Sequence, residues 1–149
     1  MEDRIREIRK GLLRWYDFTR GSRILYMGSR QEAIGELLTE TVAEAHITCA
    51  PWQETLLPDW VEKNAGTFDY VISITDLEKS TEPIETLKAW KSLLKPDGHM
   101  VLGMNNRLGL RYFCGDRDPY TGRSMDGVED YRRAYVARED PFTGRAYDR

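Results

Sequence analysis

Phe68-Asp69-Tyr70-Val71-Ile72-Ser73-Ile74 gives the strongest strand signal in this 149-residue chain. It is rich in β-branched and aromatic residues and lies between Gly66 and Asp76, so it predicts a buried β-strand. On both sides of this segment, hydrophobic periodicity predicts further strands and amphipathic helices. The predicted strands cover residues 23–28, 45–50 and 99–104, and the predicted helices cover residues 2–17, 31–41, 56–64 and 83–94.

Strands that alternate with helices are typical of a parallel sheet with right-handed crossovers. The sequence therefore predicts an α/β, Rossmann-like fold with a mostly parallel sheet of about four to five strands flanked by helices. Residues 1–106 form this predicted core. Residues 107–149 are rich in Gly, Asp, Arg and Tyr and lack clear periodicity, so we expect a long irregular segment that covers the core within the same domain.

Composition excludes several classes of protein. The chain is 40% hydrophobic and 32% charged, too apolar for a disordered chain and too charged for a membrane protein. It has no apolar run near the ~18 residues of a membrane span and no secretory leader pattern, so we expect a cytoplasmic location. The spacing of its two cysteines and two histidines indicates neither a disulfide framework nor a metal site. A net charge of −3, with Arg interleaved among Asp and Glu, disfavours nucleic acid as a partner.

Polar residues follow three of the predicted strands. In an open parallel sheet, ligands bind beyond the carboxyl ends of the strands, so we expect these residues to face one crevice. They are Gly28, Ser29, Arg30 and Gln31 after the first strand, Thr75, Asp76 and Glu78 after strand 68–74, and Asn105, Asn106 and Arg107 after the last strand. The first turn has a single glycine, which disfavours a dinucleotide-binding enzyme because a phosphate-binding loop needs several.

The order of these elements resembles a class I S-adenosylmethionine-dependent methyltransferase. The resemblance rests on residues 13–28, on residues 68–73 and on Leu93-Leu94-Lys95-Pro96-Asp97-Gly98-His99-Met100-Val101-Leu102. A helix ending in Leu-Lys-Pro-Gly-Gly before an apolar strand is typical of that family, and here Asp97 replaces one glycine. Residues 106–113, with Thr121-Gly122 and Asp126-Gly127 downstream, are similar to a bacterial subgroup associated with sugar-transfer and polysaccharide proteins.

The resemblance implies which of these residues would bind the cofactor and which would contact the methyl acceptor. S-adenosylmethionine would bind at residues 28–31 and Thr75, and a sugar or another small molecule would accept the methyl group. Asp76 and Glu78 would be the candidate general bases, with helix capping as their alternative role. The candidate acceptor contacts are Asn105, Asn106, Arg107, Tyr112, Tyr120 and Arg123. Packing of the covering segment is the alternative role of the two tyrosines.

The sequence also departs from this family. Tyr26 takes the place of an acidic residue, and Arg30 and Glu32 stand near positions that are usually small. Only about forty residues separate Gly28 from Asp69, so one β/α unit is shortened or missing. The chain also stops where relatives begin a helix that leads to their last strands, so it is either a piece of a longer protein or an abbreviated member.

These departures leave two hypotheses open. The first is a methyltransferase that acts on a sugar or polysaccharide precursor. The second is a noncatalytic scaffold or protein-interaction domain that has lost cofactor binding. A homo-oligomer formed through an open sheet edge would accompany the second hypothesis.

A short motif recurs in the last forty residues. Asp118-Pro119-Tyr120-Thr121-Gly122-Arg123 is repeated as Asp140-Pro141-Phe142-Thr143-Gly144-Arg145. Asp-Pro followed by Thr-Gly favours turns, because Pro fixes φ and Gly supplies positive φ. Two similar anion- or sugar-contacting turns and two coincidental turns are both compatible with this pattern.

Overall fold

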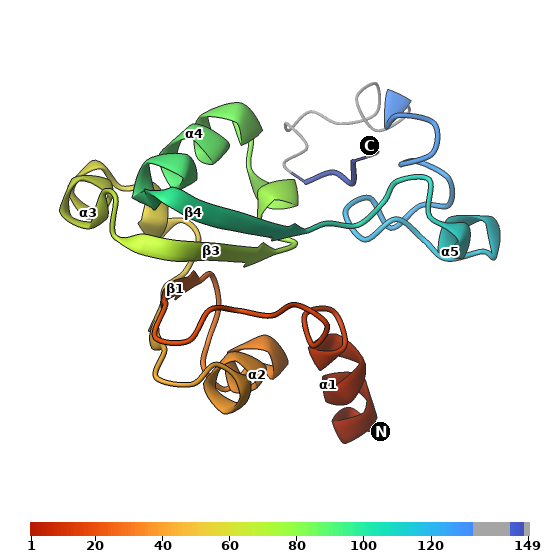
Figure 1. Ribbon diagram of the computed structural model, residues 1–149. Helices are drawn as coiled ribbons and strands as arrows, with labels where there is room; N and C mark the ends of the chain where they lie inside the picture. Colours follow the sequence, from red (N-terminus) through yellow and green to blue (C-terminus); the bar gives the residue numbers. More distant parts are fainter. Residues whose placement is uncertain (133–143, 148–149) are drawn as a thin grey trace. The chain divides into compact units, whose positions relative to one another are not determined.

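The computed structural model describes residues 1–132 and 144–147 (Figure 1). Its helices and strands follow in the order α1 (Glu2–Lys10), β1 (Arg23–Tyr26), α2 (Ala33–Thr41), β2 (His46–Cys49), η1 (Glu54–Leu56), α3 (Pro58–Asn64), β3 (Phe68–Ile74), η2 (Leu77–Lys79), α4 (Pro83–Leu93), β4 (Leu94–Gly103) and α5 (Leu110–Phe113). Among the described residues, no helix is both long enough and apolar enough to cross a bilayer.

The strands form one four-stranded sheet in the order β2-β1-β3-β4. β1 is parallel to both neighbours, with Ile24 opposite Ile47 on β2 and opposite Tyr70 on β3. β3 and β4 run in the same direction (Figure 1). The predicted α/β, Rossmann-like class with a parallel sheet of about four to five strands is therefore confirmed.

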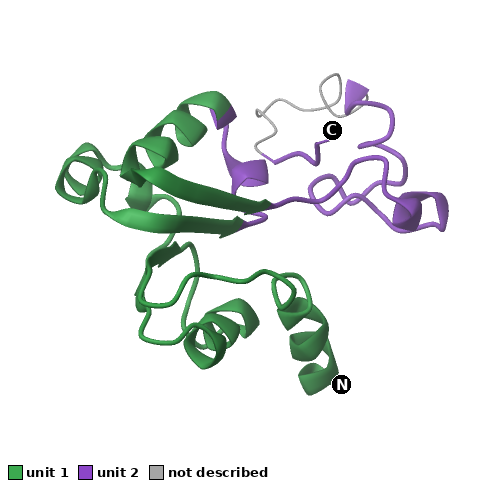
Figure 2. Ribbon diagram, in the orientation of Figure 1, with its two compact units in different colours: residues 1–73, 84–102 green, residues 74–83, 103–149 purple. Residues whose placement is uncertain are grey.

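The chain divides into two compact units (Figure 2). Unit 1 comprises residues 1–73 and 84–102 and contains nearly all of the sheet. Unit 2 comprises residues 74–83 and 103–149, that is, the turn after β3 together with the chain that follows β4.

The core of unit 1 is apolar. Ile24, Leu25, Val71 and Ile72, on the two central strands, are fully buried. Such continuous apolar runs are typical of parallel strands covered on both faces. Trp90 of α4 is also fully buried, and its indole N–H donates a hydrogen bond of 2.9 Å to the Thr55 hydroxyl. That hydrogen bond satisfies the single polar atom of this large side chain.

Most elements lie within two residues of their predicted bounds, and two differ by more. β4 begins at Leu94 rather than at residue 99, so it includes Pro96. As an outer strand, β4 can accommodate a proline, which has no N–H to donate to a neighbouring strand. α1 ends at Lys10, because Gly11 disfavours helix, and the chain continues to Tyr16 in hydrogen-bonded turns.

Candidate functional site

The turn after β1 holds four of the predicted cofactor-binding residues. Met27 N–H donates to the Ile72 carbonyl at 3.0 Å, which fixes the start of the turn beside β3. Gln31 N–H donates to the Ser29 hydroxyl at 3.3 Å, and the Gln31 carbonyl accepts a hydrogen bond of 2.8 Å from Arg6. Residues 28–31 therefore form one continuous turn that leads into α2 within unit 1.

Side chains of the chain itself fill the space beside the glycine of this turn. The Tyr26 hydroxyl donates to Glu32 Oε2 at 2.8 Å, across the turn. A Cβ atom added at Gly28 would lie 2.7 Å from Glu32 Oε2 and 2.7 Å from the Tyr26 ring. In a cofactor-binding glycine loop, such space lets the ligand approach the backbone. Here Tyr26 and Glu32 take it.

The end of β2 carries no acidic side chain that could bind a ribose, because Ala50 and Pro51 stand there. Ala50 follows β2, is buried, and donates its N–H to the Tyr26 carbonyl at 3.2 Å. Arg30 turns toward the same strand and donates to the Ile47 carbonyl at 2.6 Å. Burial raises the pKa of the nearby Cys49 thiol even though Arg30 lies close to it. The residues at the ends of β1 and β2 therefore do not fit adenosylmethionine, which needs open backbone and a carboxylate for its ribose hydroxyls.

The predicted general bases lie in unit 2, in the turn after β3. Thr75 has a positive φ of 70°, unusual for a β-branched residue, and its N–H donates to the Gly103 carbonyl at 2.7 Å. Asp76 is buried, and its carboxylate lies 3.5 Å from Lys79 Nζ. Both residues therefore take part in the structure of the turn that leads into η2.

Glu78 is a fully buried carboxylate of unit 2. It accepts hydrogen bonds from the Asn105 backbone N–H, from Asn105 Nδ2 at 3.1 Å and from the Tyr120 hydroxyl. Burial and the bond to Glu78 raise the pKa of Tyr120, so this hydroxyl stays protonated and donates. The structure thus brings together a predicted base, Glu78, and two predicted acceptor contacts, Asn105 and Tyr120. These three residues form hydrogen bonds with each other.

The other predicted acceptor contacts have separate surroundings. Asn106 pairs with Tyr147 in an isolated β-bridge, and the Arg107 guanidinium forms an ion pair of 3.0 Å with Asp130. Arg123 is exposed. Tyr112 is buried, which raises its pKa, and its hydroxyl has no hydrogen-bond partner among the described residues.

Asp118 is a buried acid that the sequence analysis did not single out as a site residue. Its carboxylate accepts hydrogen bonds from the N–H groups of Tyr120 and Thr121 at 2.9 and 3.0 Å, and from the Tyr131 hydroxyl at 2.8 Å. The signal for it was present in the repeated Asp-Pro-Tyr-Thr-Gly motif, because an Asp that opens a turn often accepts from the N–H two residues later. In the second copy of the motif, residues 140–143 lie outside the described residues, whereas Gly144 packs against the Tyr120 ring.

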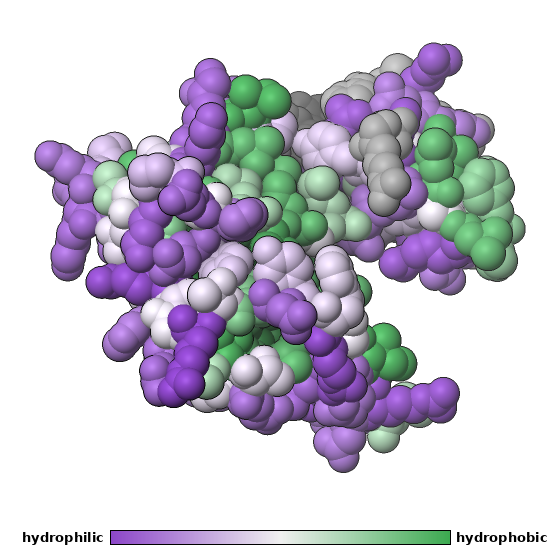
Figure 3. Space-filling model, viewed as in Figure 1, coloured by the Kyte–Doolittle hydropathy of each residue, from purple (hydrophilic) through white to green (hydrophobic). Residues whose placement is uncertain are grey.

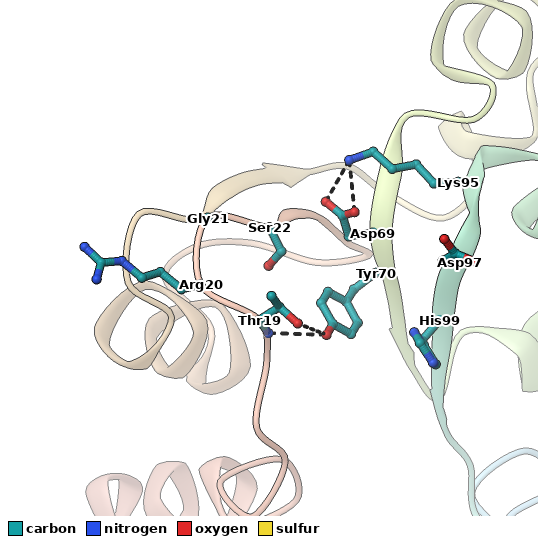
Figure 4. A pocket seen from close by; sticks show the side chains of 9 residues that line it. All are labelled: Thr19, Arg20, Gly21, Ser22, Asp69, Tyr70, Lys95, Asp97 and His99. Carbon is teal, nitrogen blue, oxygen red and sulfur yellow. Dashed lines mark hydrogen bonds and ion pairs between the residues drawn. The ribbon is translucent and has the colours of Figure 1, made fainter.

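Unit 1 has a polar pocket of about 340 Å³ near the amino ends of its strands (Figure 4). It is lined by Thr19, Arg20, Gly21, Ser22, Asp69, Tyr70, Lys95, Asp97 and His99. These residues were not predicted as a site, because ligands of an open parallel sheet usually bind beyond the carboxyl ends of the strands. The signal that could have found it is the group of polar residues near the starts of three neighbouring strands.

The polar groups of this pocket are largely engaged with each other. Lys95 Nζ lies 2.9 and 3.0 Å from the two carboxylate oxygens of Asp69, and the hydroxyls of Thr19 and Tyr70 are 2.9 Å apart (Figure 4). The His99 ring stacks on Tyr70 with ring centroids 6.0 Å apart. These contacts link residues near the beginnings of neighbouring strands. They therefore stabilise the sheet, and the pocket does not indicate a particular ligand.

Comparison with known proteins bears on the fold. No protein-family profile matches the chain, and no curated protein is similar to it in sequence. Its structure is similar to a chain from the complex between the Haloferax volcanii Trm112 methyltransferase activator and a protein described as a methyltransferase, with 17% identity and a TM-score of 0.51, over 68% of this chain and 53% of that chain. A second match, the [4+2]-cyclase SpnF, has 18% identity and a TM-score of 0.44, over 89% of this chain and 55% of that chain. The chain therefore spans about half the length of these two structures, and the first likeness supports a class I methyltransferase-like fold.

Proposed function

We propose that this chain is a methyltransferase-like domain that does not transfer methyl groups and serves as a protein-interaction or assembly module. The observation that carries the proposal is the hydrogen bond of 2.8 Å between the Tyr26 hydroxyl and Glu32, which closes the turn after β1 over Gly28. A ligand could enter that turn only by displacing both side chains. Ala50, at the end of β2, is also apolar, so this position offers no carboxylate that could bind the ribose hydroxyls.

The buried carboxylates of unit 2 support the same proposal. A general base needs a lone pair directed at the substrate. Glu78 instead accepts three hydrogen bonds from Asn105 and Tyr120, and Asp118 accepts three from the turn that follows it and from Tyr131. Acids that are fully engaged in this way stabilise a fold and are poor proton acceptors.

Adenosylmethionine-dependent methyl transfer to a sugar or polysaccharide precursor is the second candidate. The observation that favours it is a pair of buried polar atoms in unit 2, the Tyr112 hydroxyl and Asp126 Oδ2, which have no hydrogen-bond partner among the described residues. Buried polar atoms usually have a partner, and a bound acceptor would supply one. In this case Asp76 or Glu78 would act as base, and Glu78 would first have to release Tyr120.

A titration distinguishes the two candidates. Isotope-labelled protein is titrated with S-adenosylmethionine and with S-adenosylhomocysteine, and the amide signals of residues 28–33 and 75–78 are followed. We expect no saturable shift at about millimolar ligand, which is the weak limit of specific binding. Saturable shifts confined to these two turns would contradict the proposal and would justify an acceptor screen among sugars and sugar nucleotides.

The Glu32→Ala variant serves as the matched comparison. It removes the carboxylate that holds the Tyr26 hydroxyl and leaves the rest of the turn unchanged. If this variant binds S-adenosylhomocysteine and the unmodified protein does not, the bond between Tyr26 and Glu32 is what closes the turn.

A further inference from the structure

α1 packs on α2 through its charged side. The Arg6 guanidinium pairs with Glu36 of α2, and Lys10 Nζ lies 3.5 Å from Glu36 and 3.2 Å from Glu40. Lys10 is 8% exposed, and its bond to Glu40 raises its pKa. In an amphipathic surface helix the apolar side normally faces the protein. In α1 the charged side faces α2 instead.

The apolar side of the same segment is exposed. Ile5, Ile8, Leu12 and Trp15 are 47%, 65%, 52% and 74% exposed, and we call these four residues the α1 stripe. Ile5 and Ile8 lie three residues apart on one face of α1, and Leu12 and Trp15 continue the stripe in the hydrogen-bonded turns that follow Lys10. Figure 3 shows apolar surface on the side of α1 that is turned away from α2.

We propose that the α1 stripe pairs with the α1 stripe of a second copy of this chain, in an antiparallel arrangement about a two-fold axis. A two-fold contact uses the same patch on both copies, so one helix supplies the whole interface. Ile5 of one copy would pack beside Ile8 of the other, as a and d positions do in antiparallel pairs. The proposal does not depend on whether the domain binds a cofactor.

The charges beside the stripe select this arrangement. Glu2 and Arg9 flank it on one side and Arg4 flanks it on the other, and none of these three residues forms an ion pair within the described part of the chain. In an antiparallel pair, Glu2 of each copy lies beside Arg9 of the other copy, which is attractive at both ends. In a parallel pair, Arg4 would lie beside Arg9, and like charges repel.

Two other occupants of the surface are disfavoured. An anionic membrane attracts helices with excess positive charge. Arg6, Lys10 and Arg14 are held by glutamates, Arg14 by Glu7 at 2.7 Å, so that only Arg4 and Arg9, which lie near Glu2 in sequence, are left among the basic residues of α1 without an ion pair in the described part of the chain. Association through the sheet edges, which the sequence analysis predicted, is also disfavoured. β2 has only four residues and β4 contains Pro96, and short strands and proline both blunt an edge.

Sedimentation of the full chain at about 10–500 μM tests the proposal, since two short helices give a weak dimer. We expect a concentration-dependent dimer whose dissociation constant rises about a hundredfold in Ile8→Glu, because a charge would be buried at the seam. Ile84→Glu is the matched control, since Ile84 is 62% exposed on α4, outside the stripe. It should leave the dimer unchanged. A chain that is monomeric throughout, or a dimer that survives Ile8→Glu, would overturn the proposal.

Charge exchange tests the orientation. Arg9→Glu and Glu2→Arg should each weaken the dimer about fivefold, and the double variant should restore it, because exposed pairs contribute about 0.2–1 kcal/mol each. Weakening of the dimer by Arg9→Glu without restoration would contradict antiparallel pairing. Binding of the monomeric chain to phosphatidylserine vesicles, abolished by Ile8→Glu, would instead assign the stripe to a membrane surface and would overturn the proposal.

A disulfide gives an independent readout of the register. In a background of Cys49→Ser and Cys114→Ser, which removes both free cysteines, Ile5→Cys and Ile8→Cys chains are mixed and oxidised. Antiparallel pairing gives the mixed disulfide in excess over either homodimer. An excess of the Ile5→Cys homodimer would indicate parallel helices and overturn the proposal.

Discussion

Two hydroxyls that lie three residues apart before β1 have opposite surroundings. The Thr19 hydroxyl lies 2.9 Å from the Tyr70 hydroxyl and forms a hydrogen bond that joins the chain before β1 to β3. The Ser22 hydroxyl is buried and has no hydrogen-bond partner among the described residues. A buried donor without a partner loses its bonds to water and gains nothing in exchange, so the Ser22 hydroxyl destabilises the fold.

This contrast predicts opposite effects for two small substitutions. Ser22→Ala should raise the free energy of unfolding by about 1 kcal/mol, because it removes a desolvated hydroxyl. Thr19→Val should lower it by about 1 kcal/mol, because it leaves the Tyr70 hydroxyl without this partner. Urea unfolding followed by circular dichroism measures both. If Ser22→Ala destabilises the protein as much as Thr19→Val does, the Ser22 hydroxyl has a partner in solution.

At the scale of elements, Asp69 connects three neighbouring strands. It belongs to β3, accepts a hydrogen bond of 2.8 Å from Arg23 N–H at the start of β1, and pairs with Lys95 of β4. The hydrogen bond from Arg23 N–H holds the pKa of Asp69 below its usual value of 3.8, and the ion pair with Lys95 lowers this pKa further. The carboxylate is therefore stabilised in the folded state relative to the unfolded chain.

The lowered pKa predicts how stability depends on pH. Because the folded-state pKa is depressed, the contribution of Asp69 is present above pH 4 and is lost as the pH falls through the folded-state pKa. Asp69→Asn should lower the free energy of unfolding at pH 7 by about 1 kcal/mol, a modest value because the pair is partly exposed and screened by solvent. Unfolding curves between pH 2 and pH 7 should converge at the acidic end. A difference that is independent of pH would assign the loss to packing.

The same elements show what the sequence could predict. β3 and α4 were predicted to within one residue of their observed bounds, because β3 is a continuous apolar run and Pro83 sets the start of α4. The start of β4 could not be predicted, because Lys95-Pro96-Asp97-Gly98 resembles a turn until its place at the edge of the sheet is known. The bond between Tyr26 and Glu32 depends on two side chains meeting across a turn, which hydrophobic periodicity does not report.

At the scale of the molecule, the two units are stabilised by different means. Unit 1 has a sheet with fully buried aliphatic residues. Unit 2 depends on buried polar contacts around Glu78 and Asp118. The Tyr131 hydroxyl donates to Asp118 at 2.8 Å and accepts the Ala146 N–H at 2.7 Å, and Tyr120 donates to Glu78. Networks of this kind stabilise only when every member is satisfied, so unit 2 should be the more sensitive to loss of a single donor.

Tyr120→Phe tests this difference between the units. It removes the hydroxyl donor from a fully buried carboxylate and should cost unit 2 about 2 kcal/mol, which speeds amide exchange there about thirtyfold. Hydrogen exchange should change at Asn105 and Arg145, whose N–H groups bond to Glu78, while amides of β1 and β3 keep their protection. Tyr16→Phe, in unit 1, is the matched control and should alter neither region. If Tyr120→Phe lowers protection equally in both units, they open as one cooperative structure and unit 2 has no separate stability.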